Sequence, residues 1–153
     1  MRQILAVILL CLFFTACARE EELFSPAIKF RADLVQGGGC SFSADVTADF
    51  GDTIQSFSMD CVSDETDAVH LTVTEPQSLA GITATVTDQG GKITYDGMAM
   101  DFGLLANGNV IPAAAPAIVL SCWTGEYISF AGQEGERYRV TYEKNFDEKK
   151  ADC

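Results

Sequence analysis

Positive charge and histidine are scarce in this sequence. Ten Lys and Arg residues stand against 22 Asp and Glu residues, which gives a net charge of −12, and the basic residues form no cluster. Binding to nucleic acid and adsorption to an anionic membrane both need a basic surface, so the composition argues against both. The single histidine, His70, leaves little room for zinc clusters or for triads that use histidine as a base.

Internal repeats, low-complexity tracts and linkers are also missing. The chain has 153 residues, which is the length of one domain. A hydrophobic content of 48% with ten phenylalanines excludes general disorder. We therefore expect one folded domain with a single core.

The first 17 residues have the pattern of an export signal. Arg2 gives a positive start, and residues 4–14 form an apolar run that is shorter than the roughly 20 residues needed to span a bilayer. Residues 15–17 (Thr-Ala-Cys) resemble a bacterial lipobox, although Phe14 departs from the aliphatic residue usual in that motif. Ordinary secretion, with Ala16-Cys17-Ala18 as an A-x-A site, and an uncleaved anchor are the alternatives.

The lipobox interpretation predicts a lipoprotein of the cell envelope. Residues 1–16 would be a cleaved signal peptide, Cys17 the site of lipid (palmitate) attachment, and residues 17–26 the lipidated N-terminus and a polar tether. After cleavage 9 basic and 22 acidic residues remain, a net charge of −13. Two or three acyl chains anchor a protein stably, so we expect the lipid, not the charge, to hold the domain at the extracytoplasmic face of the cell membrane.

Alternating apolar and polar residues, the pattern of a half-buried strand, dominate from residue 28 onward. The pattern is present in residues 28–34, 40–46, 56–61, 69–74 and 82–87, and it returns at 137–142. Turn-forming residues separate these segments, among them Gly37-Gly38-Gly39, Gly51-Asp52 and Asp96-Gly97. The spacing predicts an antiparallel meander.

One segment has helical spacing instead. From Ala115, apolar residues recur at intervals of three and four as far as Tyr127, with Pro116 suited to a first turn and Gly132 as a candidate end. Such a stripe needs an apolar partner, and the meander supplies one. We therefore predict a mainly β (α+β) fold, an antiparallel half-barrel over residues 27–153 with one amphipathic helix packed on its concave face.

Two short stretches resemble the LolA-like superfamily of envelope proteins. They are residues 75–82 (EPQSLAGI) and residues 91–97 (GKITYDG). That superfamily includes lipoprotein carriers, sigma-regulatory periplasmic proteins, mycobacterial glycolipid carriers and clostridial germination lipoproteins, and the resemblance implies a hydrophobic ligand on the concave face. Members usually continue with further strands after the last one predicted here. Either the half-barrel is shortened, which leaves residues 137–143 as an exposed edge, or the sequence is incomplete.

No set of residues predicts catalysis or metal binding. His70 alternates with apolar neighbours, which places it on the polar face of its strand as an ordinary exposed histidine. The acidic residues Asp60, Asp64, Glu65 and Asp67 lack the EF-hand pattern, which favours a solvated loop over a calcium site. The chain contains no G-x-S-x-G nucleophile motif. We expect a protein without enzymatic activity, cofactor or metal.

Cys40 and Cys61 lie on the apolar sides of two neighbouring predicted strands. A four-residue loop at 49–52 would place the two cysteines directly opposite each other, whereas a two-residue turn at Gly51-Asp52 would pair Phe42 with Cys61. Separately from the loop, two states are open for this pair of cysteines, a disulfide or two buried thiols.

Six apolar residues are candidates for a hydrophobic pocket between sheet and helix: Phe30, Phe42, Phe57, Met59, Phe102 and Trp123. The alternative is that they fill the core. With a pocket, the protein binds a lipid or another hydrophobic small molecule, and the helix is a movable cover. With a packed core, it is an interaction module that docks and regulates another cell-envelope protein.

Overall fold

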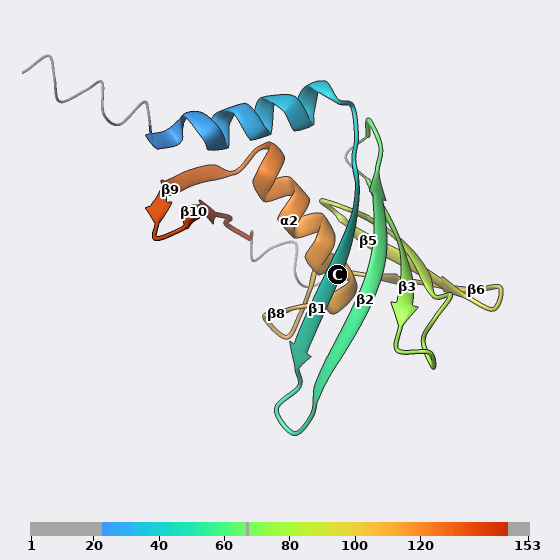
Figure 1. The fold of residues 1–153 in the computed structure, drawn as a ribbon. Helices are drawn as coiled ribbons and strands as arrows, with labels where there is room; N and C mark the ends of the chain where they lie inside the picture. Colours follow the sequence, from blue (N-terminus) through green and yellow to red (C-terminus); the bar gives the residue numbers. More distant parts are fainter. Residues whose placement is uncertain (1–22, 67, 147–153) are drawn as a thin grey trace, which may run out of the picture.

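A strongly bent antiparallel sheet organises the computed structural model, which describes residues 23–66 and 68–146 (Figure 1). Its six strands are β1 (Ser41–Asp49), β2 (Ile54–Ser63), β3 (Val69–Glu75), β4 (Thr83–Thr87), β5 (Gly90–Tyr95) and β6 (Met98–Phe102). Each strand pairs with the next, and within the described residues β6 does not pair back with β1. The sheet is therefore open, and the predicted antiparallel half-barrel meander is confirmed.

The register of the first hairpin decides between the two alternatives for Gly51-Asp52. The Phe50 N–H donates to the Thr53 carbonyl at 2.9 Å, and Phe42 pairs with Cys61. This is the register of the two-residue turn. The last hairpin of the sheet turns at Asp96-Gly97, where both residues have positive φ (48° and 75°), as predicted for a tight turn.

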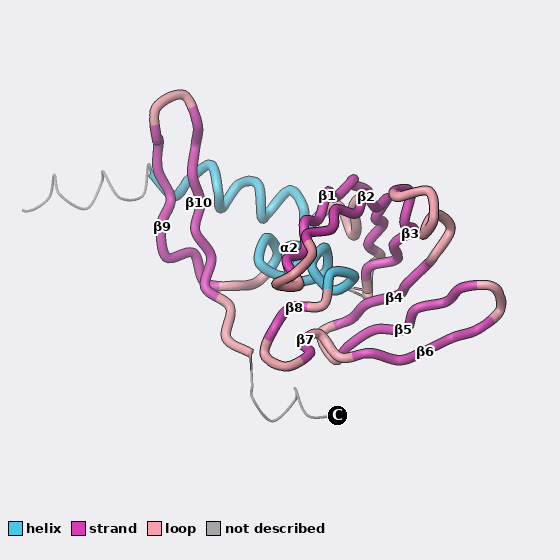
Figure 2. The backbone as a smooth tube through the Cα atoms, turned by 90° about the horizontal axis from the view of Figure 1, so that it is seen from below, coloured by secondary structure: helices cyan, strands magenta, loops and turns pink. Residues whose placement is uncertain are grey.

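After β6 the chain forms two hairpins with a helical segment between them (Figure 2). A short hairpin of β7 (Leu105–Ala106) and β8 (Asn109–Val110) leads into the 3₁₀ helix η1 (Pro112–Ala114) and the helix α2 (Ala115–Thr124). The strands β9 (Tyr127–Glu134) and β10 (Arg137–Glu143) then form a separate two-stranded hairpin. Figure 2 shows this hairpin beside the N-terminal helix, apart from the six-stranded sheet.

The predicted strand at residues 28–34 is wrong, because residues 23–36 form a helix. The covered positions of this N-terminal helix are Phe24, Ala27, Arg31, Ala32 and Leu34, and all except Ala32 follow one another at intervals of three or four residues. Residues 28–34 alone alternate between apolar and polar, whereas the helical spacing becomes visible only when Phe24 and Ala27 are included. Residues 23–26, assigned above to the tether, are already helical.

The predicted helix from Ala115 is confirmed, but it ends at Thr124 instead of continuing through Tyr127 towards Gly132. Gly125, which has a poor helix propensity, follows the last turn, and its N–H donates to the Ser121 carbonyl at 3.0 Å. Tyr127 and Gly132 both belong to β9. Tyr127 is 70% exposed, so it contributes nothing to the buried side of α2.

The main core lies between the inner face of β2–β4 and α2. Val69 and Val86 have no exposed surface, and Met59, Cys61 and Leu71 are at most 3% exposed. Leu120 from α2 and Ala114 from η1 close this layer. Full burial of such a side chain stabilises the fold by about 1.5–3 kcal/mol, so α2 is an integral part of the core rather than an addition to it.

Candidate functional site

Five of the six residues predicted to line a pocket, all except Phe30, belong to the main core or pack against it. The Trp123 ring meets the rings of Phe30 and Phe42 edge to face, with centroid distances of 5.7 and 5.9 Å. Met59 is 3% exposed, and Phe57 and Phe102 pack on the core as partly buried residues. The structure therefore brings Phe30 and Phe42 together at Trp123, and it places Phe57 and Phe102 against the core on β2 and β6.

A groove with both apolar and polar lining residues is present instead at the open end of the half-barrel. It has a volume of about 680 Å³ and lies between the tip of the β1–β2 hairpin, the β7–β8 hairpin and the start of α2. We call it the mouth groove. Its apolar lining residues are Val46, Ala48, Phe50, Ala106, Val110, Ile111, Pro112 and Ala115.

The lining residues of the mouth groove remain accessible. Phe50 is 58% exposed and Val110 is 44% exposed, although both are large apolar side chains. Thr47, Asp49, Asn107 and Asn109 supply a polar rim. Polar and apolar groups contribute about equally to the lining. A concave surface that combines apolar side chains with placed polar groups is the common form of a small-molecule site.

Sequence reasoning missed this groove. The alternation of β1 continues past Val46 to Ala48 and Phe50, which is a signal that the inner face extends to the hairpin tip. The sequence does not predict the β7–β8 hairpin or its position near that tip, because each of its strands has only two residues.

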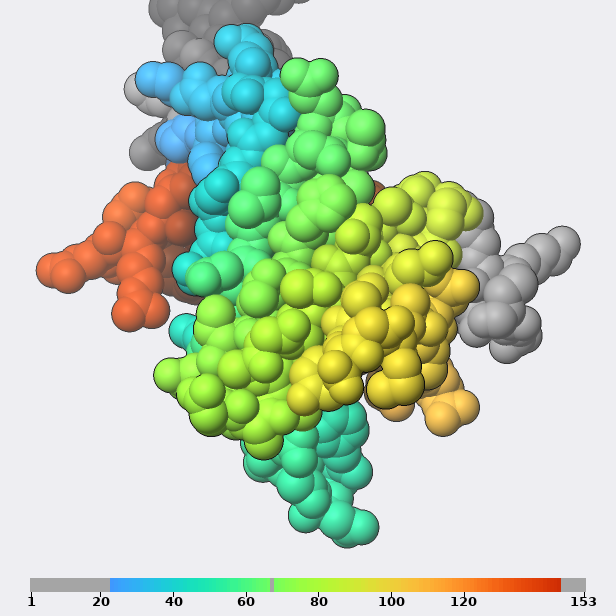
Figure 3. All heavy atoms as spheres, turned by 90° about the vertical axis from the view of Figure 1, so that its right-hand side faces the viewer, coloured from blue at the N-terminus to red at the C-terminus, as the bar shows by residue number. Residues whose placement is uncertain are grey.

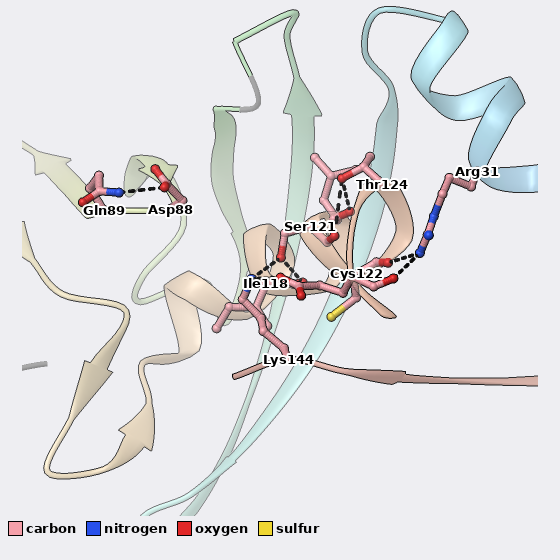
Figure 4. A network of polar contacts seen from close by, with 10 residues as sticks. Arg31, Asp88, Gln89, Ile118, Ser121, Cys122, Thr124 and Lys144 are labelled. Atoms are coloured by element: carbon pink, nitrogen blue, oxygen red, sulfur yellow. Dashed lines mark hydrogen bonds and ion pairs between the residues drawn. The ribbon is translucent and has the colours of Figure 1, made fainter. Parts of the chain in front are cut away.

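A polar cluster holds the C-terminal end of α2 (Figure 4). Arg31 donates to the carbonyls of Trp123 at 2.9 Å, Cys122 at 3.1 Å and Glu126 at 2.6 Å. The last carbonyls of a helix have no partner within it, and a guanidinium satisfies several of them at once. Arg31 therefore joins the N-terminal helix to α2, which fixes the helix that was predicted to be a movable cover.

Lys144 lies next to Ser121 in the same cluster, beside a cavity of about 600 Å³. Its Nζ donates to the Ser121 Oγ at 2.9 Å and to the Glu126 Oε1 at 2.5 Å. The salt bridge with Glu126 engages the same Lys144 nitrogen that contacts Ser121. The Ser121 hydroxyl donates to the Ile118 carbonyl at 2.8 Å, so this pair is a structural contact rather than a nucleophile and its base.

His70 forms hydrogen bonds on both sides of its ring. Nδ1 lies 3.1 Å from the Thr85 Oγ1, and Nε2 lies 3.1 Å from the Asp64 Oδ2. The side chains of His70 and Asp64 are 51% and 44% exposed, so this chain of contacts is open to solvent. Hydrogen bonds from Thr66 lower the pKa of Asp64 to about 2, with a smaller contribution from His70. These contacts fix the turn between β2 and β3 to the outer face of the sheet, and the predicted exposed position of His70 is confirmed.

Cys40, Cys61 and Cys122 are free thiols in the structure. Phe42 stands opposite Cys61, and the Ser63 N–H donates to the Cys40 carbonyl, so Cys40 and Cys61 are diagonal neighbours. Diagonal Cα atoms are about 7–8 Å apart, beyond the usual range of a disulfide. Burial raises the pKa of the Cys61 thiol to about 11. The two cysteines are therefore free thiols, of which Cys61 is buried and Cys40 is half-buried, and a disulfide would need a different register.

The predicted signal peptide, the lipid site at Cys17 and the acidic residue Asp67 lie outside the described residues. Among the described residues, no helix combines the length and hydropathy needed to cross a bilayer.

Comparison of the chain with models of known protein families, with curated proteins and with solved structures gave no match. The resemblance to the LolA-like superfamily therefore stays a prediction from the two short motifs.

Proposed function

We propose that this protein is a lipid-anchored envelope protein that binds a hydrophobic ligand, such as an acyl chain, in the mouth groove, without catalysis. The observation that carries the proposal is the groove of about 680 Å³ at the open end of the half-barrel, in which exposed apolar side chains such as Phe50 and Val110 take part. Sites for small molecules have volumes of about 300–1,000 Å³. The leader ending at Cys17 supports the anchor.

The proposed ligand site, the mouth groove, does not include the aromatic residues around Trp123. The T-shaped contacts of Trp123 with Phe30 and Phe42, together with the Arg31 hydrogen bonds, hold α2 against the sheet. Opening this layer would expose core residues such as Val69 and Val86 to water. Entry at the mouth groove needs no such change, because Phe50 and Val110 are exposed already.

The experiment is a titration of the full-length protein with a fluorescent fatty acid, followed by displacement with palmitate. We expect saturable, reversible binding. Ala48→Trp, which fills the groove, should weaken binding at least tenfold. Thr94→Trp introduces the same side chain on the exposed outer face of β5 and should leave binding unchanged. Absence of binding, or equal effects of the two substitutions, would remove the mouth groove as the site.

A second experiment tests the anchor separately. Radioactive palmitate should label the protein in cells, and Cys17→Ala should abolish the label. Continued labelling of the variant would contradict lipid attachment at Cys17, and it would leave the ligand proposal standing.

The interaction module is the second candidate, because the predicted aromatic pocket is a packed core. It predicts that the fluorescent fatty acid does not bind and that a protein from the same envelope does.

A further inference from the structure

β6 is the last strand of the six-stranded sheet, and no second strand pairs with it within residues 23–66 and 68–146. In the space-filling view β5 and β6 lie at the surface of the molecule (Figure 3). Proteins usually protect a free edge with proline, a bulge or several charges. β6 has only Asp101, contains no proline, and pairs with β5 without a register shift.

The inner face of this edge is apolar and uncovered. Met98 is 69% exposed and Met100 is 65% exposed, whereas Val86, on the same face of β4, has no exposed surface. Opposite residues of the β5–β6 pair, Ile93 with Met100 and Tyr95 with Met98, continue the apolar face to the end of the hairpin. The apolar side of the sheet thus extends beyond the part that α2 covers.

The backbone groups available at the edge follow from the register. Tyr95 and Met98 flank the two-residue turn, so they form a hydrogen-bonded pair, and the alternation of an antiparallel ladder turns the groups of Met100 towards β5 as well. The N–H and C=O groups of Ala99 and Asp101 therefore point to the free edge.

We infer that β6 pairs with β6 of a second copy of this chain, antiparallel, about a two-fold axis at Met100. Ala99 of each copy would stand opposite Asp101 of the other, which uses every edge-facing group in four hydrogen bonds. On the inner face, Met98 would stand opposite Phe102, and a thioether against an aromatic ring is a favourable contact. The two sheets would form one continuous apolar face.

Charge and geometry select this register. An axis at Asp101 would place the two Asp101 carboxylates directly opposite each other, which is destabilising. An axis at Ala99 would use Gly97, whose positive φ of 75° belongs to the turn and not to a strand. A register shifted by one residue would place the apolar side chains of one copy opposite polar side chains of the other, because successive residues of a strand point to opposite faces. The axis at Met100 has none of these costs, and Lys92 remains 3.7 Å from Asp101 on the outer face.

The test is cysteine cross-linking of the full-length chain carrying Cys153→Ser. At an axis of this kind the two Met100 Cα atoms are about 4.5 Å apart, which suits a disulfide. Met100→Cys should therefore give a dimer under mild oxidation, with the Met100→Cys peptides joined in mass spectrometry. Ala99→Cys is the matched control, since it faces Asp101 rather than its own copy and should stay at the level of the unsubstituted chain.

A second variant separates pairing from folding. Ala99→Pro removes an N–H that points away from β5, so the hairpin keeps its own hydrogen bonds. We expect Ala99→Pro to retain the circular dichroism spectrum and to sediment as a monomer at a concentration where the unsubstituted chain sediments as a dimer. Equal cross-linking of the two cysteine variants, no cross-link above background, or a dimer that survives Ala99→Pro would overturn the inference. Pairing of β6 with a different protein would also fail the Met100→Cys test.

Discussion

Arg31 on the N-terminal helix donates from Nε to the carbonyl oxygen of Trp123, 92 positions later in the chain, at 2.9 Å. This contact joins the first described helix to the end of α2, and the Arg31 guanidinium also stands 5.9 Å from the Tyr142 ring of β10. One side chain therefore connects three elements that are far apart in the sequence.

Arg31→Ala should lower the free energy of unfolding, because it leaves the carbonyls of Trp123, Cys122 and Glu126 without this donor. We expect a loss of about 1.5–3 kcal/mol, as for partly buried hydrogen bonds to a charged group, measured by urea denaturation.

Arg139→Ala is the matched control. It removes an exposed ion pair with Glu134 at 3.3 Å, which should cost less than about 0.5 kcal/mol. Equal effects of the two substitutions would show that Arg31 does not fix α2.

Substitution by alanine should have different effects on stability at two methionines of the same sheet face, because one is buried and the other is exposed. Met59 is 3% exposed and Met98 is 69% exposed. Met59→Ala creates a cavity in the core and should cost about 2–5 kcal/mol. Met98→Ala should change the stability of the dilute protein by less than about 0.5 kcal/mol. Thermal and urea unfolding of both variants measure the difference, and a similar cost for each would contradict the assignment of the core.

Gly91 should tolerate no side chain while Phe102 is present. A Cβ at residue 91 would lie 2.4 Å from Cζ of the Phe102 ring, which covers the glycine from the neighbouring strand. Gly91→Ala should destabilise the protein by about 1–3 kcal/mol through this overlap. In a Phe102→Ala background the same substitution should cost much less, and a double-mutant cycle measures the coupling. Additive effects would show that the ring does not occupy this position.

The carboxyl group of Asp64 should titrate at about pH 2, below its ordinary pKa of 3.8, because Thr66 donates to it from both its hydroxyl and its backbone N–H. A folded-state pKa below the unfolded one means that Asp64 stabilises the fold above about pH 4 and loses this contribution as the pH falls through about 2. Carboxyl NMR titration measures the midpoint.

Thr66→Ala should raise the Asp64 midpoint more than His70→Ala does, because the Thr66 hydroxyl is the larger cause of the shift. Thr72→Ala, at another exposed position of β3, should leave the midpoint where it is. A larger response to His70→Ala would assign the shift to the ion pair instead.

The strands were predictable because their apolar residues alternate wherever one face is buried, as Val69, Leu71 and Val73 do. The N-terminal helix was not predictable from residues 28–34, whose alternation is also that of a strand. The contacts that favour the helix, such as those of Ala27 with β9 and of Arg31 with α2, are tertiary. Of the predicted aromatic residues, Phe30 and Phe42 do contact Trp123, but a sequence does not say whether neighbouring side chains leave space between them. The mouth groove depends on the meeting of two hairpins, and no local pattern encodes that meeting.

The most direct measurement for the proposed function is an amide NMR titration of the full-length protein with palmitate. We predict shifts confined to the amides that line the mouth groove, while the amides of Val69 and Val86 in the core stay unchanged. The lining amides are those of residues 46–51, Ala106, Asn107, residues 109–111 and Ala115. Shifts centred on Trp123 and Phe42, or no shifts at all, would contradict this prediction.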